Sequence, residues 1–372
     1  MNNINIIGAG LSGLAASCYL AKRGYNVTLI DKNEAFGGRI SSMIKQGFVF
    51  DMGPTWYWMP DVFESFFSDF GKKVSDYYIL ERLDPSYKFF LKNNEYNIPV
   101  DEDSLYKVFE SIEKGSSQNL KKYLSQAKKK YDLSMDKFIY LPNKSVFEYA
   151  SFSLIKNIFS LNIFKSLRSH IASFFKNKTI KDMLEFPSMF LGGTPYNTPA
   201  LYSLMNYADI VGGTWYPIGG MNEVSKAFVS LSKELGVTHI YNENITHFNI
   251  LDGKIFEAVS KSGNSYKADA YICSAEYPFV QMNLIEEKYR SYNQKYWSAK
   301  NIAPSALIFY LGVSEKIQNL DHHNLFFDKD FDNHLDDIFK KNILPEEPLF
   351  YACCPSKTDS SVVPDENMEN LY

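Results

Sequence analysis

The stretch INIIGAGLSG, which runs from Ile4 to Gly13, sets the architecture of this chain. A short β-branched segment leads into Gly8, Gly10 and Gly13, spaced as Gly-x-Gly-x-x-Gly, and a helical pattern follows. In such a motif the first glycine allows a tight turn, the second lets a pyrophosphate approach the backbone, and the third lets helix and strand pack closely. The pyrophosphate then sits on the positive end of the helix dipole. The stretch therefore predicts a dinucleotide-binding strand–turn–helix unit.

The residues that follow complete this unit. Gly24 ends the helical pattern, and Val27–Ile30 predicts a second strand that stops at Asp31. An acidic residue at this place accepts hydrogen bonds from the ribose hydroxyls of a bound dinucleotide. Because strand, glycines, helix, second strand and acid follow one another in register, we expect a dinucleotide site rather than an isolated glycine pattern.

A second glycine-rich loop, Gly37–Arg39, comes shortly after Asp31. Its backbone and its guanidinium group can both reach phosphate oxygens. The alternative is an ordinary turn with a surface arginine, but the neighbouring ribose-binding acid favours phosphate binding. Two strand-like segments, Ser41–Ile44 and Phe48–Met52, come next and lead into Gly53–Thr55.

Composition excludes several classes of function. The chain has 372 residues and a formal net charge of -4, which argues against nucleic acid as a partner. Its cysteines have no metal-ligand spacing, so we expect no metal site and a reducing, cytoplasmic environment. Aromatic residues make up 16% of the chain, which indicates either aromatic-filled cores or a large apolar cavity or membrane-facing surface.

The pattern changes twice along the chain. The part after Pro60 is mainly helical by periodicity, and α/β patterning returns with a helix expected over Asn222–Leu235. Strands are expected over Thr238–Tyr241 and Ala270–Ser274, and the second of these is expected to rejoin the sheet that begins near Ile4. We therefore expect a discontinuous dinucleotide-binding domain and a substrate domain, made of residues 1–60 plus 212–275 and of residues 61–211 plus 276–372, respectively.

Between Tyr149 and Lys181 the chain has no Asp or Glu, but basic residues alternate with many Phe, Ile and Leu residues. Such a basic amphipathic stretch suits the surface of an anionic membrane, where apolar side chains insert and lysines pair with headgroups. The alternative is a helical hairpin that packs on its own domain and exposes its lysines. Residues 145–181 are expected to be helical in both cases and membrane-associating in the first.

Taken together, these segments resemble the bacterial-type phytoene desaturase (carotenoid desaturase) family of FAD-dependent, amine-oxidase-like oxidoreductases. The resemblance covers essentially the whole chain. The two glycine-rich motifs are shared with many flavoenzymes, whereas other segments are more specific to this family. These are GFVFDMGPTWYWMP (Gly47–Pro60), FLGGTPYNTPALYSL (Phe190–Leu204) and GGTWYPIGGMNEV (Gly212–Val224).

The resemblance implies an α/β fold, in which a Rossmann-like, glutathione-reductase-like FAD-binding domain joins a mixed-sheet substrate domain with a helical insertion. It implies FAD as the cofactor, with the backbone of Ile245 contacting the adenine and Gly53–Thr55 passing close to the flavin. The cofactor-binding residues that it implies are Gly8, Gly10, Gly13, Asp31, Gly38, Arg39, Gly53, Pro54, Thr55 and Ile245.

The resemblance also implies a reaction. Two hydrogens leave adjacent carbons of a phytoene-like polyene in carotenoid biosynthesis, a hydride passing to flavin N5 and a proton leaving the neighbouring carbon. An apolar polyene substrate, peripheral association with the inner face of the cell membrane, and quinone or oxygen as electron acceptor are implied with it. His239, His247, His322 and His323 have no partner at a telling spacing, so we expect surface or core placement and assign no catalytic base.

Other functions stay open. A hydroxycarotenoid desaturase, a carotenoid isomerase or an amine oxidase would use the same cofactor site. Family members also carry a second glycine-rich FAD motif in their last part, which this sequence lacks. The chain is therefore expected to be C-terminally truncated, and an inactive dinucleotide-binding fragment is a further alternative. A nicotinamide dehydrogenase is disfavoured, because Gly37–Arg39 has no role in that binding mode.

Overall fold

A parallel four-stranded sheet carries the N-terminal glycine motif. The computed structural model describes residues 2–141, 145, 162–300 and 305–372. The strand order is β13-β1-β2-β9, and β13 pairs with β1 with Ile272 opposite Ile6. The expectation that this distant strand rejoins the first sheet is thus confirmed. The strands are β1 (Asn3–Ile7), β2 (Asn26–Ile30), β9 (Thr238–Ile240) and β13 (Ala270–Cys273).

Helices cover one face of this sheet and a second sheet covers the other. The helices are α1 (Leu11–Lys22) and α9 (Asn222–Glu234), and Leu14 of α1 packs with Val224 of α9 in one buried cluster. On the other face, Ile30 packs with Phe248. Phe248 belongs to an antiparallel sheet made of β10 (Ile245–Leu251), β11 (Lys254–Ser260) and β12 (Ser265–Tyr266).

A mixed four-stranded sheet forms the base of the second lobe. Its order is β16-β15-β6-β7; β15 runs parallel to β6, and the other neighbours are antiparallel. The mixed sheet expected for the substrate domain is therefore present. Its strands are β6 (Tyr87–Phe90), β7 (Glu95–Ile98), β15 (His323–Phe326) and β16 (Phe350–Cys353).

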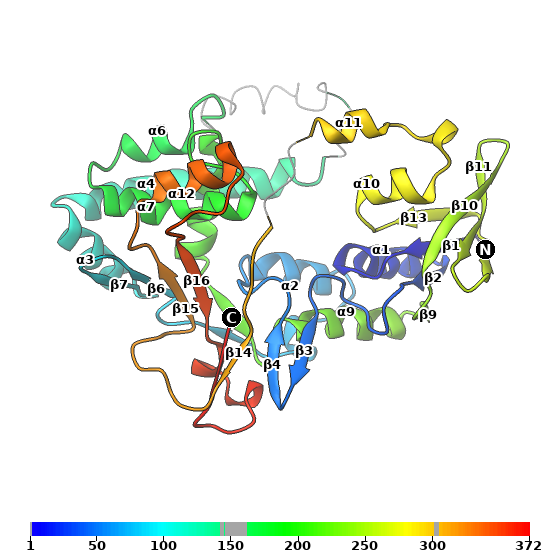
Figure 1. Ribbon diagram of the computed structural model, residues 1–372, viewed down its shortest axis with the longest axis horizontal. Coiled ribbons are helices and arrows are strands. Elements are labelled where there is room, and N and C mark those ends of the chain that lie inside the picture. The colour runs from blue at the N-terminus through cyan, green and yellow to red at the C-terminus, as the bar shows by residue number, and fades with distance from the viewer. Residues whose placement is uncertain (1, 142–144, 146–161, 301–304) are drawn as a thin grey trace.

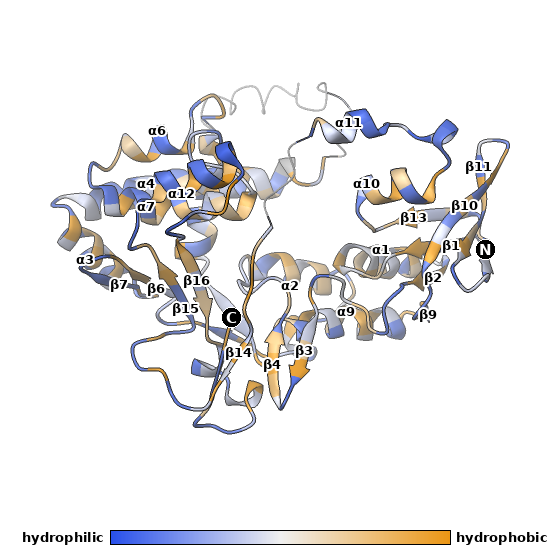
Figure 2. Cartoon of the chain, viewed as in Figure 1, coloured by the Kyte–Doolittle hydropathy of each residue, from blue (hydrophilic) through white to orange (hydrophobic). Residues whose placement is uncertain are grey.

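Helices pack on this sheet and form the core of the second lobe (Figure 1). They are α3 (Glu102–Ile112), α4 (Ser116–Leu133), α6 (Leu167–Ala172), α7 (Lys178–Glu185) and α12 (Phe331–Asp336). Apolar residues concentrate on the strands and on the inner sides of these helices (Figure 2). Buried aromatic rings such as Tyr123 and Phe175 fill this core, so much of the aromatic excess serves packing.

Part of the basic stretch, residues 146–161, lies outside the described residues. In the described part, Leu167, Ile171 and Phe175 are buried in the core of the second lobe, whereas Phe164 is 89% exposed. The described half of the stretch therefore packs mainly on its own lobe, as the hairpin alternative predicted. Among the helices that the structure describes, none has the length and apolar character needed to cross a membrane.

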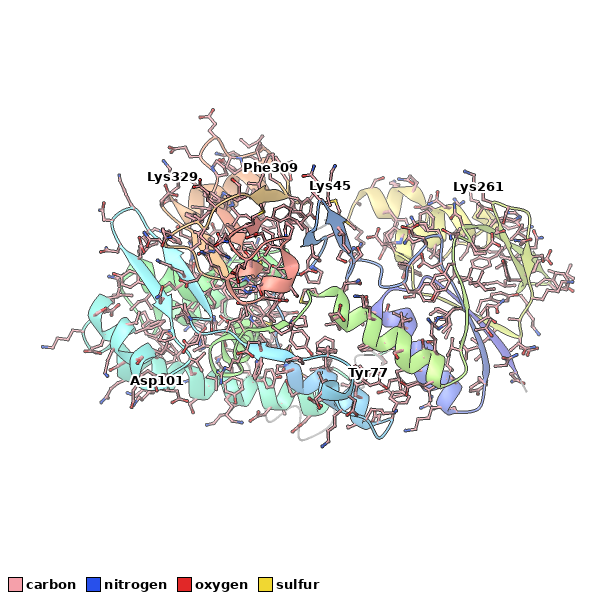
Figure 3. The ribbon with its side chains drawn as sticks, turned by 90° about the horizontal axis from the view of Figure 1, so that it is seen from below. Lys45, Tyr77, Asp101, Lys261, Phe309 and Lys329 are labelled. Atoms are coloured by element: carbon pink, nitrogen blue, oxygen red, sulfur yellow. The ribbon has the colours of Figure 1, made fainter. Side chains whose placement is uncertain are left out.

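Short elements join the two lobes. Seen from below, Asp101 and Lys261 lie toward opposite ends of the molecule, with Lys45 between them (Figure 3). Lys45 ends the first strand of the hairpin expected from the sequence, β3 (Ser42–Lys45) with β4 (Phe48–Asp51). Other joining elements are α2 (Pro60–Ser68), β5 (Leu80–Arg82), β8 (Trp215–Pro217), β14 (Leu311–Val313) and β17 (Glu369–Leu371).

Candidate cofactor site

A cavity of about 860 Å³ opens at the carboxyl ends of β1, β2 and β13. Ligands of open parallel sheets bind outside these ends, where the loops after the strands converge. The volume lies within the usual range of small-molecule and cofactor sites. Of the residues predicted for the cofactor, those that line the cavity are Gly8, Gly10, Asp31, Gly38, Arg39 and Ile245.

The glycines of the first motif differ in what surrounds them. Gly10 precedes α1, lines the cavity, and a Cβ placed on it would meet no atom within 4 Å. Gly13 does not line the cavity, and a Cβ there would overlap the carbonyl oxygen of Gly8. Gly10 therefore keeps the cavity open, whereas Gly13 permits the close packing of α1 against the turn after β1.

The second glycine loop stacks on this turn. The backbone nitrogen of Gly37 donates to the carbonyl oxygen of Ala9 at 2.9 Å. Gly38 has φ +59°, and a Cβ on it would lie 3.0 Å from Cα of Gly10. Two glycine-rich backbone segments thus form one continuous wall, which offers little steric hindrance to a pyrophosphate.

Arg39 is placed at the cavity but is paired with a residue that the sequence argument did not consider. Its guanidinium forms an ion pair with the Glu276 carboxylate, which also lines the cavity, and both side chains are largely exposed. Glu276 comes just after β13 and precedes α10 (Tyr277–Phe279). The rule that strand carboxyl ends line the site could have identified Glu276, once Ala270–Cys273 was expected to join the sheet.

Asp31 holds the glycine turn as well as facing the cavity. Its Oδ2 accepts from the nitrogen of Ala9 at 2.7 Å, and its Oδ1 accepts from the nitrogen of Asn33 at 2.9 Å. Carboxylate oxygens have further lone pairs, so ribose hydroxyls can still donate to it. The backbone nitrogen of Glu243, another lining residue absent from the sequence prediction, donates to the carbonyl oxygen of Asp31 at 2.8 Å.

Glu243 fixes the loop that precedes Ile245. Hydrogen bonds donated by Ser262, Tyr266 and Asn264 lower the pKa of its carboxyl to about 2. The Glu243 side chain therefore stays ionised and ties β10 to β12 beside the cavity. No local sequence pattern predicts this role, because the hydrogen-bond partners of Glu243 lie about twenty residues away along the chain.

Gly53, Pro54 and Thr55 lie outside the cavity lining but next to it. A Cβ on Gly53 would overlap the carbonyl oxygen of Arg39, so the two backbones are in close contact. On the other side, the Tyr351 hydroxyl donates to Oγ1 of Thr55 at 3.0 Å. The segment therefore bridges the cavity and the mixed sheet of the second lobe.

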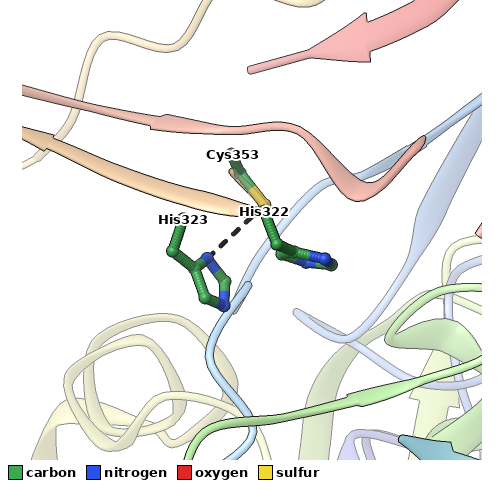
Figure 4. Close-up of side chains that lie close together, drawn as sticks. All are labelled: His322, His323 and Cys353. Carbon is green, nitrogen blue, oxygen red and sulfur yellow. Dashed lines mark hydrogen bonds between the residues drawn. The ribbon is translucent and has the colours of Figure 1, made fainter. Parts of the chain in front are cut away.

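A buried cluster of His322, His323 and Cys353 lies at this sheet (Figure 4). Pairing of β15 with β16 places His323 opposite Cys353, and candidate ligand atoms of all three lie within 4.8 Å of one another. Burial lowers the pKa of His322 to about 3 and that of His323 well below its ordinary value. Both histidines are thus neutral. Of the two placements expected for them, surface or core, the structure shows the core.

The Nδ1 atoms of these histidines already have partners. His322 Nδ1 lies 2.8 Å from the Thr358 hydroxyl, and His323 Nδ1 lies 2.6 Å from the Tyr351 hydroxyl. No local sequence pattern indicated this cluster, because Cys353 lies on a different strand from His323.

Comparison with known proteins assigns this arrangement to a family. The flavin containing amine oxidoreductase family matches residues 11–363. The chain belongs to this family. The chain is accordingly an FAD-dependent oxidoreductase, and the glycine wall, the helix N-terminus at Gly10 and the acid at Asp31 fit the adenosine and pyrophosphate of that cofactor.

Two curated relatives match this chain over nearly its whole length. It is 37% identical to the carotenoid 3,4-desaturase of Haloarcula japonica over 373 residues, covering 100% of this chain and 75% of the relative. It is 30% identical to the zeta-carotene-forming phytoene desaturase of Myxococcus xanthus, covering 99% of this chain and 71% of the relative.

Solved structures share the fold of this chain. A protein of Pyrococcus furiosus superposes with a TM-score of 0.62 at 17% identity, covering 99% of this chain and 78% of that one. Reduced UDP-galactopyranose mutase superposes with a TM-score of 0.55 at 15% identity, covering 100% and 73%, respectively. The α/β fold expected from the sequence, with a Rossmann-like domain, is therefore confirmed.

Proposed function

We propose that this protein desaturates a carotenoid precursor. The observation that carries the proposal is the match to two carotenoid desaturases along essentially the entire chain, rather than over the dinucleotide motif alone. The specific segments Gly47–Pro60 and Phe190–Leu204 support it, because they lie outside the motif shared by many flavoenzymes.

The cavity residues are proposed to divide the cofactor between them. The backbone of Gly8, Gly10 and Gly38 and the N-terminal end of α1 face the pyrophosphate, and Asp31 accepts from the ribose. The backbone of Ile245 contacts the adenine. Gly13 lets α1 pack closely against the turn after β1, and Arg39 neutralises phosphate charge. Gly53, Pro54 and Thr55 approach the flavin. When bound, FAD supplies the acceptor for the hydride.

An apolar polyene would bind through burial alone, at about 25 cal/mol per Å² of apolar surface. Rings gather beside Thr55 in a way that suits such a ligand. Trp56 lies 5.4 Å from Trp58 and 5.7 Å from Phe190, measured between ring centroids, and Phe190 is half exposed. We propose that this aromatic group receives the polyene and orients its reacting carbons. The final electron acceptor is proposed to be a quinone or oxygen.

The two lobes are proposed to correspond to two domains. Residues 1–60 and 212–275 would bind the cofactor, whereas residues 61–211 and 276–372 would bind the polyene. Residues 145–181 are proposed to touch the inner face of the cell membrane, which stores apolar polyenes. The exposed Phe164 next to Lys165 supports this part. Flotation with anionic liposomes tests it, and failure to float with them would rule it out.

Expression of the chain in a phytoene-producing bacterial host tests the desaturase function. We expect products with longer conjugation, detected by absorbance after chromatography, and a purified protein with flavin absorption bands. A yellow protein that leaves phytoene unchanged but oxidises an amine would replace the desaturase with an amine oxidase. A colourless protein would instead support the inactive dinucleotide-binding fragment.

A further inference from the structure

We propose that Thr55 donates a hydrogen bond to the ring system of bound FAD, and that Tyr351 and His323 are positioning residues that orient its hydroxyl. The inference rests on the proposed function, since it requires the flavin to lie beyond Arg39, next to Gly53–Thr55. It adds a chain of residues from the second lobe to the cofactor site of the first.

The hydrogen bonds in this chain run in one direction. The Tyr351 hydroxyl donates to Oγ1 of Thr55 at 3.0 Å. A phenol has one hydrogen, so the contact of 2.6 Å between Tyr351 and Nδ1 of His323 needs the histidine as donor. His323 is therefore the tautomer with hydrogen on Nδ1. The Cys353 sulfur makes a longer contact, 3.8 Å, with the same Nδ1 atom.

Thr55 is left with a hydrogen to give. Its oxygen accepts from Tyr351, and within the described ranges its hydroxyl donates to no protein atom. Thr55 is half-buried, so water satisfies this hydrogen less readily than at the surface. A cofactor ring with acceptor atoms beside Thr55 would complete the chain of hydrogen bonds.

The chain is also rigid. His323 is fully buried, and Trp56 stacks on it with ring centroids 4.1 Å apart and an angle of 7° between the planes (Figure 4 shows His323 at the strand end). Burial raises the pKa of Tyr351 far above its ordinary value, so the phenol keeps its hydrogen. On the cavity side, Gly53 is held against the backbone of Arg39. The position of the Thr55 hydroxyl oxygen is thereby set before any ligand arrives.

The test uses the full chain loaded with FAD, four test variants and one control variant. Thr55→Val and Tyr351→Phe each remove a hydroxyl at nearly constant shape, Thr55→Ser keeps the hydroxyl, and the double variant combines the first two. Thr358→Val is the matched control, because it removes the partner of His322 in the same buried cluster without touching Thr55. The readouts are the visible absorption spectrum and the midpoint potential of the bound flavin, with thermal unfolding recorded for each variant.

A donor at the flavin ring stabilises the negative charge of the reduced form, so its loss lowers the midpoint potential. We expect Thr55→Val and Tyr351→Phe to shift spectrum and potential in the same sense, and the double variant to match Thr55→Val. Thr55→Ser and Thr358→Val should leave both readouts at wild-type values.

Folded, flavin-loaded Thr55→Val and Tyr351→Phe variants with unchanged spectra and potentials would overturn the inference and leave the proposed function intact. An equal shift in Thr358→Val would overturn it too, because general loosening of the cluster would then explain the effect. A wild-type chain that binds no FAD would refute the cofactor part of the proposed function itself. If one of the variants Tyr351→Phe and Thr55→Val fails to fold, the spectrum and midpoint potential of the other are sufficient to test the inference.

Discussion

Oδ2 of Asp31 lies 2.7 Å from the backbone nitrogen of Ala9. This bond ties the end of β2 to the turn after β1. The Asp31 carboxylate therefore holds the glycine turn in place, and both line the same cavity. An acid at this position is usually discussed for its contact with ribose. In this chain it is also a structural clamp.

Replacing Asp31 with Ala should therefore reduce both stability and cofactor binding. Two backbone N–H groups lose their acceptor, at about 1–3 kcal/mol for each buried group left unpaired. We expect a lower free energy of unfolding in urea and a dissociation constant for FAD raised by more than about tenfold. Unchanged urea unfolding of Asp31→Ala would show that the clamp contributes nothing.

Two glycine substitutions should separate folding from binding. Gly10 has φ -71° and ψ 176°, angles open to any residue, and the added methyl group of Gly10→Ala points into free space at the cavity. We expect stability within about 0.5 kcal/mol of wild type and strongly weakened FAD binding. Gly13→Ala should instead unfold more easily, by about 1–3 kcal/mol or more, because its Cβ overlaps the turn. Fluorescence titration and urea unfolding of both variants check this, and equal effects on stability would contradict it.

Glu276→Gln should strengthen FAD binding. Arg39 is paired with Glu276 in the ligand-free chain, and a phosphate must compete for the same guanidinium. Because both side chains are exposed, we expect a gain of only about two- to fivefold, larger at low ionic strength. Glu286→Gln is the control, since Glu286 pairs with Lys288 away from the cavity lining. Weaker binding by Glu276→Gln would mean that the pair orients Arg39 instead of restraining it.

The stability of the second lobe should fall as pH rises toward neutrality. Burial raises the pKa of Asp209, which accepts from Tyr87 at 2.6 Å, from an ordinary 3.8 to about 7. The unfolded carboxyl ionises first, so stability present at acid pH is lost as pH rises through about 7, by up to about 1.4 kcal/mol per unit. Asp209→Asn cannot ionise and should lack this dependence. Urea unfolding from about pH 5 to about pH 8 measures it, and parallel profiles for the two proteins would refute the assignment.

The parts of this fold that could be predicted from the sequence are those where a local pattern and a strand-pairing rule agree. Gly8, Gly10 and Asp31 belong to a motif whose geometry is short-range, and they line the cavity. The strand expected over Ala270–Ser274 pairs with β1 as predicted. The roles of Glu243 and Glu276 were missed, because they depend on which loops meet at the strand ends. A pairing rule predicts which strand ends converge, but not which side chains of the following loops line the cavity.

The contacts of His323 were beyond any local pattern. Its partners Tyr351 and Cys353 lie on β16, and only the pairing of β15 with β16 brings them together. The same holds for Thr55, whose role in joining the lobes depends on a hydroxyl almost the full chain length away. Such contacts depend on the pairing of strands that are far apart in the sequence. This pairing cannot be inferred from the residue spacing of a single sequence.

The pairing of β13 with β1 determines when the cofactor cavity can form during synthesis. When β1, α1 and β2 have left the ribosome, only part of the cavity wall can form. The rest must wait until the helical region and β13 have been synthesised. Contacts between such distant segments form late, because closing a long loop costs entropy before the contact is made. Free FAD can therefore meet the completed cavity wall only after Cys273 has left the exit tunnel.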